Sequence, residues 1–409
     1  MRRMSEGASG GMTADEREWL RVRGELKRRR HPLAVLAARE YPPDARVAGT
    51  PLLAAPGWIP PEPVPIDSVV IDLDPGREQP GGLTGREPVS EGVRPLRADG
   101  SRYGGYAAAV AHLDRPALFV DLPTYRLCDA DLSLPGARGT LSFGLGSYFD
   151  GLDVGEACAH EYAAATQGAE GLPVRRAVGM PWELHRRPAS MAISTLTIRR
   201  DRRTGTATVL LHRRDPAKVG HAGGLLQVVP VGVFQPSGPA EWNIRNDFDL
   251  WRSITREYSE ELLGTAEEYG SDTRPIDYGR WPFAADLAAA RQSGAVRVSV
   301  LGLGVDPLTF ATDLLTVAVF DAPAFDELFA GLVGTNAEGE NLARLEASRP
   351  AVPEPDRAGT ATGPRPERRT PGIPFTERTV DRLVHHEPMQ AAGAALIALA
   401  WRHRRHLLG

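Results

Sequence analysis

The strongest constraint on this 409-residue chain lies in residues 256–264, which read R-E-Y-S-E-E-L-L-G. If this stretch is helical, Glu257, Glu260 and Glu261 occupy positions i, i+3 and i+4, so all three carboxylates leave from one face. Clustered carboxylates repel one another, so they need compensation from an arginine such as Arg256 or from divalent cations, which prefer hard oxygen ligands. A solvated acidic helix face is the plain alternative.

The same stretch carries the other signals of an amphipathic helix. Gly264 stands where a helix C-cap glycine is expected. Apolar residues recur every four positions on an adjoining stripe, which would anchor the helix to a core. These apolar residues are Leu250, Ile254, Tyr258 and Leu262.

The run R-E-Y-S-E-E resembles the second half of the Nudix box, R-E-(apolar)-x-E-E, and a predicted strand pair and a Pro/Gly turn precede it, as in that family. The chain departs from the family pattern at two places. Gly264 comes one residue late, and an insertion without the loop glutamate separates Gly232, the counterpart of the box's first glycine, from Arg256. The resemblance implies an α+β fold: a C-terminal Nudix-like α/β/α sandwich with a mixed sheet, after a smaller α+β N-terminal region.

The resemblance also implies roles for individual residues. Glu260 and Glu261 would be ligands of Mg²⁺ or Mn²⁺, and Glu257 would be a ligand or the general base. Arg256 would orient the carboxylates through ion pairs, and the Gly232 carbonyl would face a metal ion.

Residues outside the box give weaker signals. Arg213 and Arg214 follow a predicted strand, close to where phosphate could lie, but exposed edge charges explain them equally well. The family often recruits a further acid from a later loop, and Asp306 and Asp313 are the candidates.

Three readings of function stay open. The resemblance implies a metal-dependent hydrolase that cleaves the diphosphate bond of a nucleoside diphosphate linked to another moiety. The altered box also fits a non-catalytic Nudix-fold protein that binds a nucleotide-like ligand or regulates another process. The basic run at residues 27–31 is the sole support for DNA binding, and a net charge of −4 argues against bulk nucleic-acid binding.

Composition narrows the class of protein. An apolar content of 42% and a charged content of 24% are those of a soluble globular protein. Cys128 and Cys158 lack metal-ligand spacing and read as buried hydrophobic residues in a reducing cytosol. No apolar run reaches the roughly 18 residues of a membrane span, and the first twelve residues lack the apolar centre of a signal peptide. We therefore expect a cytoplasmic protein with a small-molecule substrate and no membrane partner, and a homodimer stays open.

The chain divides by pattern into segments. We expect a disordered start at residues 1–12, a helix at 13–41 with a capping box of Thr13 and Glu16, and a Pro/Gly-rich extended stretch at 42–100. A small α+β region of unknown role follows at 101–184. The Nudix-like domain then fills 185–409, with a flexible Pro- and Arg-rich insertion at about 348–373.

Periodicity predicts the individual elements of these segments. Expected strands lie at residues 68–73, 117–121, 191–199, 206–212, 225–233, 296–305 and 314–320. Expected helices lie at residues 106–113, 156–166, 324–332, 379–384 and 390–403.

Overall fold

The computed structural model of the chain describes residues 11–79, 81–133, 139–215, 224–266, 269–336, 339–342 and 372–409. Within these residues the fold combines helices with three β-sheets, which contain both parallel and antiparallel strand pairs. The expected α+β class is therefore confirmed. None of the helices in the described residues is both long and apolar enough to cross a membrane.

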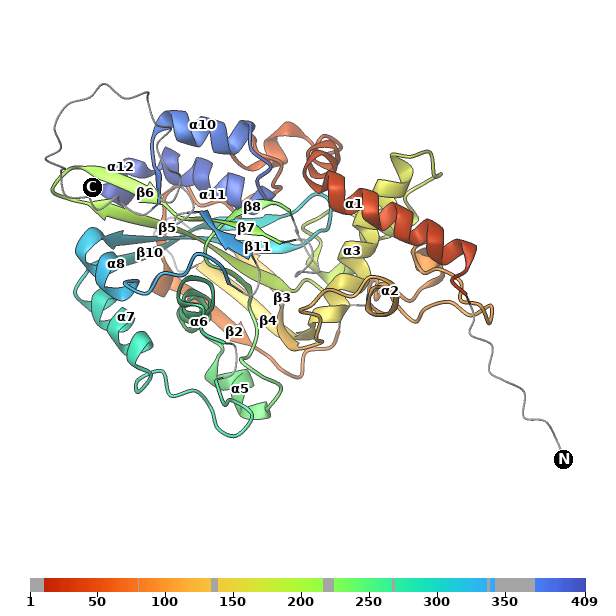
Figure 1. The fold of residues 1–409 in the computed structure, drawn as a ribbon, viewed down its shortest axis with the longest axis horizontal. Coiled ribbons are helices and arrows are strands. Elements are labelled where there is room, and N and C mark those ends of the chain that lie inside the picture. Colours follow the sequence, from red (N-terminus) through yellow and green to blue (C-terminus); the bar gives the residue numbers. More distant parts are fainter. Residues whose placement is uncertain are drawn as a thin grey trace, which may run out of the picture.

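A seven-stranded sheet forms the centre of the molecule (Figure 1). Six of its strands follow the order β1, β10, β11, β5, β6 and β13, and the seventh strand, β9, also pairs with β5. The strands are β1 (Val64–Pro65), β5 (Met191–Asp201), β6 (Thr206–Val209), β9 (Val231–Val233), β10 (Val296–Val305), β11 (Thr312–Asp321) and β13 (Ile373–Pro374). β5 and β11 run parallel, and β11 is buried along nearly its whole length, as expected of a strand covered on both faces.

Helices cover both faces of this sheet (Figure 1). Helices α10 (Glu377–His385) and α11 (Ala391–Arg402) lie on one face, and α11 contacts β5, β10 and β11. Helices α6 (Leu250–Leu263), α7 (Pro282–Gln292) and α8 (Ala322–Leu328) lie on the other face. In this arrangement α6 contacts β9 and β5, and the carboxylates of Glu257 and Glu261 lie next to β9.

Two three-stranded sheets flank the central sheet. One has the order β12 (Gly339–Asn341), β7 (Leu211–Arg214) and β8 (Leu226–Val228). The other has the order β2 (Val69–Leu73), β4 (Gly139–Ser147) and β3 (Pro123–Asp131), with β2 parallel and β3 antiparallel to β4. The remaining helices are α1 (Ala14–Ala38), α2 (Tyr106–Leu113), α3 (Tyr148–Ala165), α4 (Pro173–Val178), α5 (Glu241–Asn246) and α12 (Arg404–Leu408).

Helix α1 begins with the predicted capping box. The Thr13 hydroxyl accepts a hydrogen bond from the Glu16 N–H at 3.0 Å, and the Glu16 carboxylate accepts one from the Thr13 N–H at 2.8 Å. Part of the basic run at residues 27–31 is turned toward the rest of the chain rather than toward solvent. Arg30 is buried and donates two hydrogen bonds to Glu156 of α3, and Lys27 pairs with Asp114. These two pairs attach α1 to the rest of the chain, whereas Arg28 and Arg29 pair with Glu25 of the same helix.

One hydrophobic core crosses the predicted division between residues 184 and 185. Tyr125 and Phe143 of the N-terminal region pack against Phe234, with ring centroids 4.5 and 5.4 Å away. Strand β1 adds to the central sheet from the N-terminal side. The two predicted regions therefore share one core, and the division into domains stays a prediction.

Three predicted strands differ from the structure, because the partners of a strand come from distant parts of the chain and a local pattern does not reveal them. Residues 117–121 form a loop and no strand. Phe119 in this loop is buried, and its ring centroid lies 4.6 Å from that of Phe149, so one apolar side chain of the segment reaches the core without a strand. The predicted strand at 206–212 divides into β6 and β7, which belong to different sheets. The predicted strand at 225–233 divides into β8 and β9 at the cis Val229–Pro230 peptide bond. Nearly all of the predicted insertion at 348–373 lies outside the described residues.

Candidate active site

The three glutamates of α6 line one cavity of about 970 Å³. Its walls come from α6, β9, the first residues of β5 and β11, helix α3 and the segment 118–122. A cavity of this size can enclose a small molecule such as a nucleotide. Both predicted regions of the chain contribute to it, so the N-terminal region forms part of any binding site here.

Local sequence signals place α6 against this cavity. The Asp249 side chain caps the helix by accepting a hydrogen bond from the Arg252 N–H at 2.8 Å. Gly264 ends the helix in the left-handed region with φ of 69°, where glycine carries no steric penalty. The predicted apolar stripe, made of Leu250, Ile254, Tyr258 and Leu262, is buried. Burial of this stripe directs the acidic face toward the cavity.

Glu261 connects α6 to strand β9. Its side chain is buried, and Oε1 accepts a hydrogen bond from the backbone N–H of Val231 at 2.8 Å. Its second oxygen, Oε2, lies 3.7 Å from Nδ1 of His212 on β7. Glu261 therefore has a structural contact in addition to its place in the cavity wall.

Glu257 and Glu260 are half-buried and line the same cavity. Glu260 Oε1 accepts a hydrogen bond from the hydroxyl of Tyr269 at 2.6 Å. Burial, and then the negative charge of Glu260, raise the pKa of the Tyr269 hydroxyl, so this hydroxyl stays a proton donor.

Gly232 lies directly against Glu257. A Cβ atom built on Gly232 would come within 1.8 Å of Glu257 Oε1, a separation that two atoms cannot adopt. Glycine at this position therefore makes room for the carboxylate. Gly232 also pairs with Ile193 of β5, which holds it in the cavity wall.

Arg256 has other partners than we expected. Its guanidinium donates to the Gln235 carbonyl at 2.6 Å and to the Tyr278 hydroxyl at 2.7 Å, and it lies 3.8 Å from Asp247 Oδ1. The negative charge of Glu257 also contributes to raising the pKa of Arg256, and the expected ion pairs of Arg256 with the glutamates stay a prediction. Arg256 lines the cavity and fixes the segment after β9 against α6.

The weaker candidates divide between cavity and surface. Arg214 lines the cavity, whereas Arg213 is exposed and lies outside the cavity lining. Asp306 also lies outside the lining; its Oδ1 accepts from the backbone N–H groups of Leu308 and Thr309, which makes it a turn residue. Asp313 lines the cavity, is buried, and accepts a hydrogen bond from the Ser194 hydroxyl at 2.8 Å.

Four polar residues that the sequence did not single out also line the cavity: Arg187, Gln227, Thr312 and Gln390. All four are buried, and each has a polar side-chain atom without a hydrogen-bond partner in the part of the chain that the structure describes. Buried polar groups normally have partners, so such atoms mark places where water or a ligand can bind. Of these four, Gln227 could have been noticed in the sequence, because it is a polar residue within the otherwise apolar stretch 225–233.

The glutamates in this cavity are of the chemical type that binds a divalent cation, because Mg²⁺ and Mn²⁺ take carboxylate oxygens as ligands. Among the described residues, however, no three His, Cys, Asp or Glu side chains form a group that could hold an ion. The Tyr269 hydroxyl and the Val231 N–H instead donate to Glu260 and Glu261. A cation at this place would compete with these donors.

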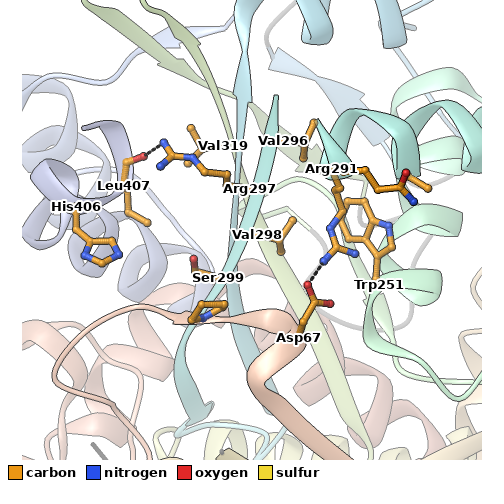
Figure 2. A pocket seen from close by; sticks show the side chains of 13 residues that line it. Asp67, Trp251, Arg291, Val296, Arg297, Val298, Ser299, Val319, His406 and Leu407 are labelled. Atoms are coloured by element: carbon orange, nitrogen blue, oxygen red, sulfur yellow. Dashed lines mark hydrogen bonds and ion pairs between the residues drawn. The ribbon is translucent and has the colours of Figure 1, made fainter. Parts of the chain in front are cut away.

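A second pocket, of about 560 Å³, offers much less chemistry (Figure 2). It lies between β10, α7 and α12. Both of its arginines already have partners, as Figure 2 shows: Arg291 donates to Asp67 at 2.7 Å, and Arg297 donates to the Leu407 carbonyl at 2.8 Å. The cavity of α6 is therefore the better candidate for an active site.

Comparison with known proteins adds no family assignment. The sequence matches no protein-family model, and it has no significant match among curated proteins. The resemblance to the Nudix box therefore depends on the residues of α6 and on Gly232.

Proposed function

We propose that this chain is a divalent-metal-dependent hydrolase that cleaves the diphosphate bond of a nucleoside diphosphate linked to another moiety. The observation that carries the proposal is the presence of Glu257, Glu260, Glu261 and Gly232 in the wall of one cavity. These are the residues to which the Nudix resemblance gave catalytic or metal-binding roles. The cavity volume of about 970 Å³ also suits a ligand of nucleotide size.

In this proposal each glutamate has a distinct role. A bound Mg²⁺ or Mn²⁺ would neutralise phosphate oxygens and lower the pKa of a water molecule. Glu260 and Glu261 would hold the cation, and Glu257, held against Gly232, would accept a proton from the attacking water. The water oxygen bonds to phosphorus as the bond to the bridging oxygen breaks, and the bridging oxygen leaves on the second product.

The second candidate function is a non-catalytic protein that binds a ligand in the same cavity. The hydrogen bonds of Tyr269 to Glu260 and of Val231 to Glu261 favour it, because they occupy carboxylate oxygens that a catalytic cation would use. The two candidates differ in whether a cation and Glu261 are required for turnover.

Turnover of a substrate panel separates these candidates. We would measure release of phosphate or nucleoside monophosphate from nucleotides, dinucleotides and nucleotide sugars with Mg²⁺, with Mn²⁺ and with EDTA. Glu261→Gln is the test variant, because its amide oxygen can still accept from the Val231 N–H whereas an amide binds Mg²⁺ poorly. Glu327→Gln is the matched control, since Glu327 is exposed on α8 and does not line the cavity.

The hydrolase proposal expects metal-dependent turnover in the wild type and in Glu327→Gln, and loss of that turnover in Glu261→Gln. Full activity in Glu261→Gln would overturn the site. Binding of nucleotides without turnover under any metal condition would favour the non-catalytic protein.

A further inference from the structure

Arg187 is a buried cation in the wall of the same cavity. Its exposed fraction is 2%, and it lies just before β5. One guanidinium nitrogen, Nη2, donates to the Phe310 carbonyl at 3.0 Å. The other, Nη1, has no hydrogen-bond partner in the described part of the chain. The guanidinium therefore keeps an unused donor beside the cavity.

In the part of the chain that the structure describes, Arg187 has no carboxylate partner. None of the ion pairs among the described residues includes it, and the groups that act on its charge most strongly are the Cys158 thiol and the Tyr41 hydroxyl. Burial lowers the pKa of Arg187 to about 10, and these two groups offset only part of that effect. Other buried arginines differ: Arg23 and Arg30 both pair with Glu156. An isolated buried charge is costly unless an opposite charge joins it.

The surroundings of Arg187 strengthen the positive potential there. Its guanidinium lies 5.7 Å from the centre of the Phe310 ring, and that of Arg175 lies 4.6 Å from the same centre. Phe310 also lines the cavity and has φ of 56°, a region that bulky residues rarely adopt. Unfavourable backbone conformations of this kind concentrate at ligand sites.

We propose that Arg187 and the adjacent wall at Phe310 form an anion subsite, which binds a phosphate or carboxylate group of the ligand. This proposal rests on the proposed function for the position of the diphosphate, and it adds that the substrate carries a further anionic group. Arg187 precedes Ile193, the partner of Gly232, by six residues, so the Cα atoms of Arg187 and Ile193 are at most about 22 Å apart. We therefore expect the substrate to be a diphosphate compound whose second acidic group can contact Arg187 while the diphosphate lies near Gly232.

The test measures anion binding without any metal. Inorganic phosphate and succinate are titrated separately into the full chain in EDTA by calorimetry, which distinguishes a phosphate group from a carboxylate. The variants are Arg187→Gln, which can still donate to the Phe310 carbonyl, and Arg187→Lys, which keeps the charge. Arg213→Gln is the control, because Arg213 is exposed and outside the cavity lining.

At least one of the two anions is expected to bind the wild type and Arg213→Gln equally, and to bind Arg187→Gln about 10- to 100-fold more weakly, as for loss of a charged hydrogen bond. Arg187→Lys is expected to lie between them. Unchanged binding in Arg187→Gln, or no binding of either anion to the wild type at millimolar concentration, would overturn the subsite. If Arg187→Gln does not fold, binding to folded Arg187→Lys that equals binding to the wild type overturns it instead.

The hydrolase proposal can fail without affecting this test. Anion binding is measured in EDTA, so it requires neither a bound cation nor turnover. Anion binding that persists without any hydrolysis would retain the subsite and reject the enzyme.

Discussion

The backbone N–H of Val231 donates to Glu261 Oε1 at 2.8 Å, which attaches the acidic helix α6 to strand β9. This strand is also the one that carries Gly232, the residue in contact with Glu257. The hydrogen bond therefore helps to fix the distance between the helix and the strand on which the proposed chemistry depends. Variants of Glu261 can therefore separate its structural contact with Val231 from its proposed role in chemistry.

Glu261→Ala and Glu261→Gln should differ in stability although both lose turnover. Alanine leaves the buried Val231 N–H without its acceptor, which costs about 1–3 kcal/mol, whereas glutamine keeps an acceptor oxygen. Urea denaturation monitored by circular dichroism gives the free energy of unfolding of each variant. Equal stability of the two variants would show that the Val231 contact contributes nothing.

Gly232→Ala should disrupt the site through its contact with Glu257. The new methyl group would lie 1.8 Å from Glu257 Oε1, so either the carboxylate or β9 must move. We expect loss of metal-dependent turnover, and recovery of any lost stability in the double variant Gly232→Ala/Glu257→Ala, measured as a double-mutant cycle.

Gly24→Ala is the matched control for that substitution. A Cβ atom on Gly24 meets one atom within 4 Å, Arg28 Nη1 at 3.5 Å, and Gly24 lies inside helix α1. Alanine there should raise the free energy of unfolding by up to about 1 kcal/mol. Normal turnover in Gly232→Ala would contradict the role of that glycine.

The sequence predicted α6 well because its signals are local. The spacing of the glutamates, the apolar stripe and Gly264 each act within one helix, so no knowledge of distant partners is needed. Strands β8 and β9 were predicted as one strand, because the sequence does not state that β8 pairs with β7 while β9 pairs with β5. Partner choice is non-local, and so the break at Val229–Pro230 could not be predicted from alternation alone.

The other residues of the cavity wall could not be predicted from the sequence either. Arg187 follows Arg186 in an ordinary polar segment, and no local pattern indicates that only Arg187 is buried. Its environment comes from Phe310, which is more than a hundred residues away in the chain. Likewise, Arg256 stood beside the glutamates in the sequence, yet Asp247 and Tyr278 are its partners. Adjacency in sequence predicted the helix face but not these two partners of Arg256.

The pH dependence of stability should include a contribution from Asp153. Burial raises the pKa of this carboxyl group to about 6, although the Ala107 N–H, which donates to it at 2.6 Å, lowers it. The folded protein therefore binds this proton more tightly than the unfolded chain, whose aspartate pKa is about 3.9. The resulting stability, about 3 kcal/mol, is present below pH ~4 and is lost as the pH rises through about 6.

Asp153→Asn should remove this pH dependence, because the amide is uncharged and its oxygen can still accept from Ala107. Thermal unfolding between pH 4 and 7 should therefore show a smaller decrease in stability for Asp153→Asn than for the wild type. Asp286→Asn, at an exposed position on α7, is the control and should follow the wild type. Identical pH profiles for all three proteins would exclude the contribution of Asp153.

Tyr269 should determine how tightly a cation binds at Glu260. Its hydroxyl donates to Glu260 Oε1 at 2.6 Å, and the raised pKa of Tyr269, caused first by burial and then by Glu260, keeps that proton in place. Tyr269→Phe removes the competing donor, so Mg²⁺ or Mn²⁺ should bind about tenfold or more tightly, which corresponds to one hydrogen bond to a charged group. Titration calorimetry with each metal measures the change.

Tyr278→Phe is the control for that substitution, because the Tyr278 hydroxyl bonds to Arg256 and Asp247 rather than to a glutamate of α6. Its metal affinity should equal that of the wild type. Tighter metal binding in Tyr269→Phe together with faster turnover would mean that Tyr269 restrains a hydrolase. Tighter binding with no turnover would favour the ligand-binding protein, and unchanged affinity would show that a cation does not use Glu260.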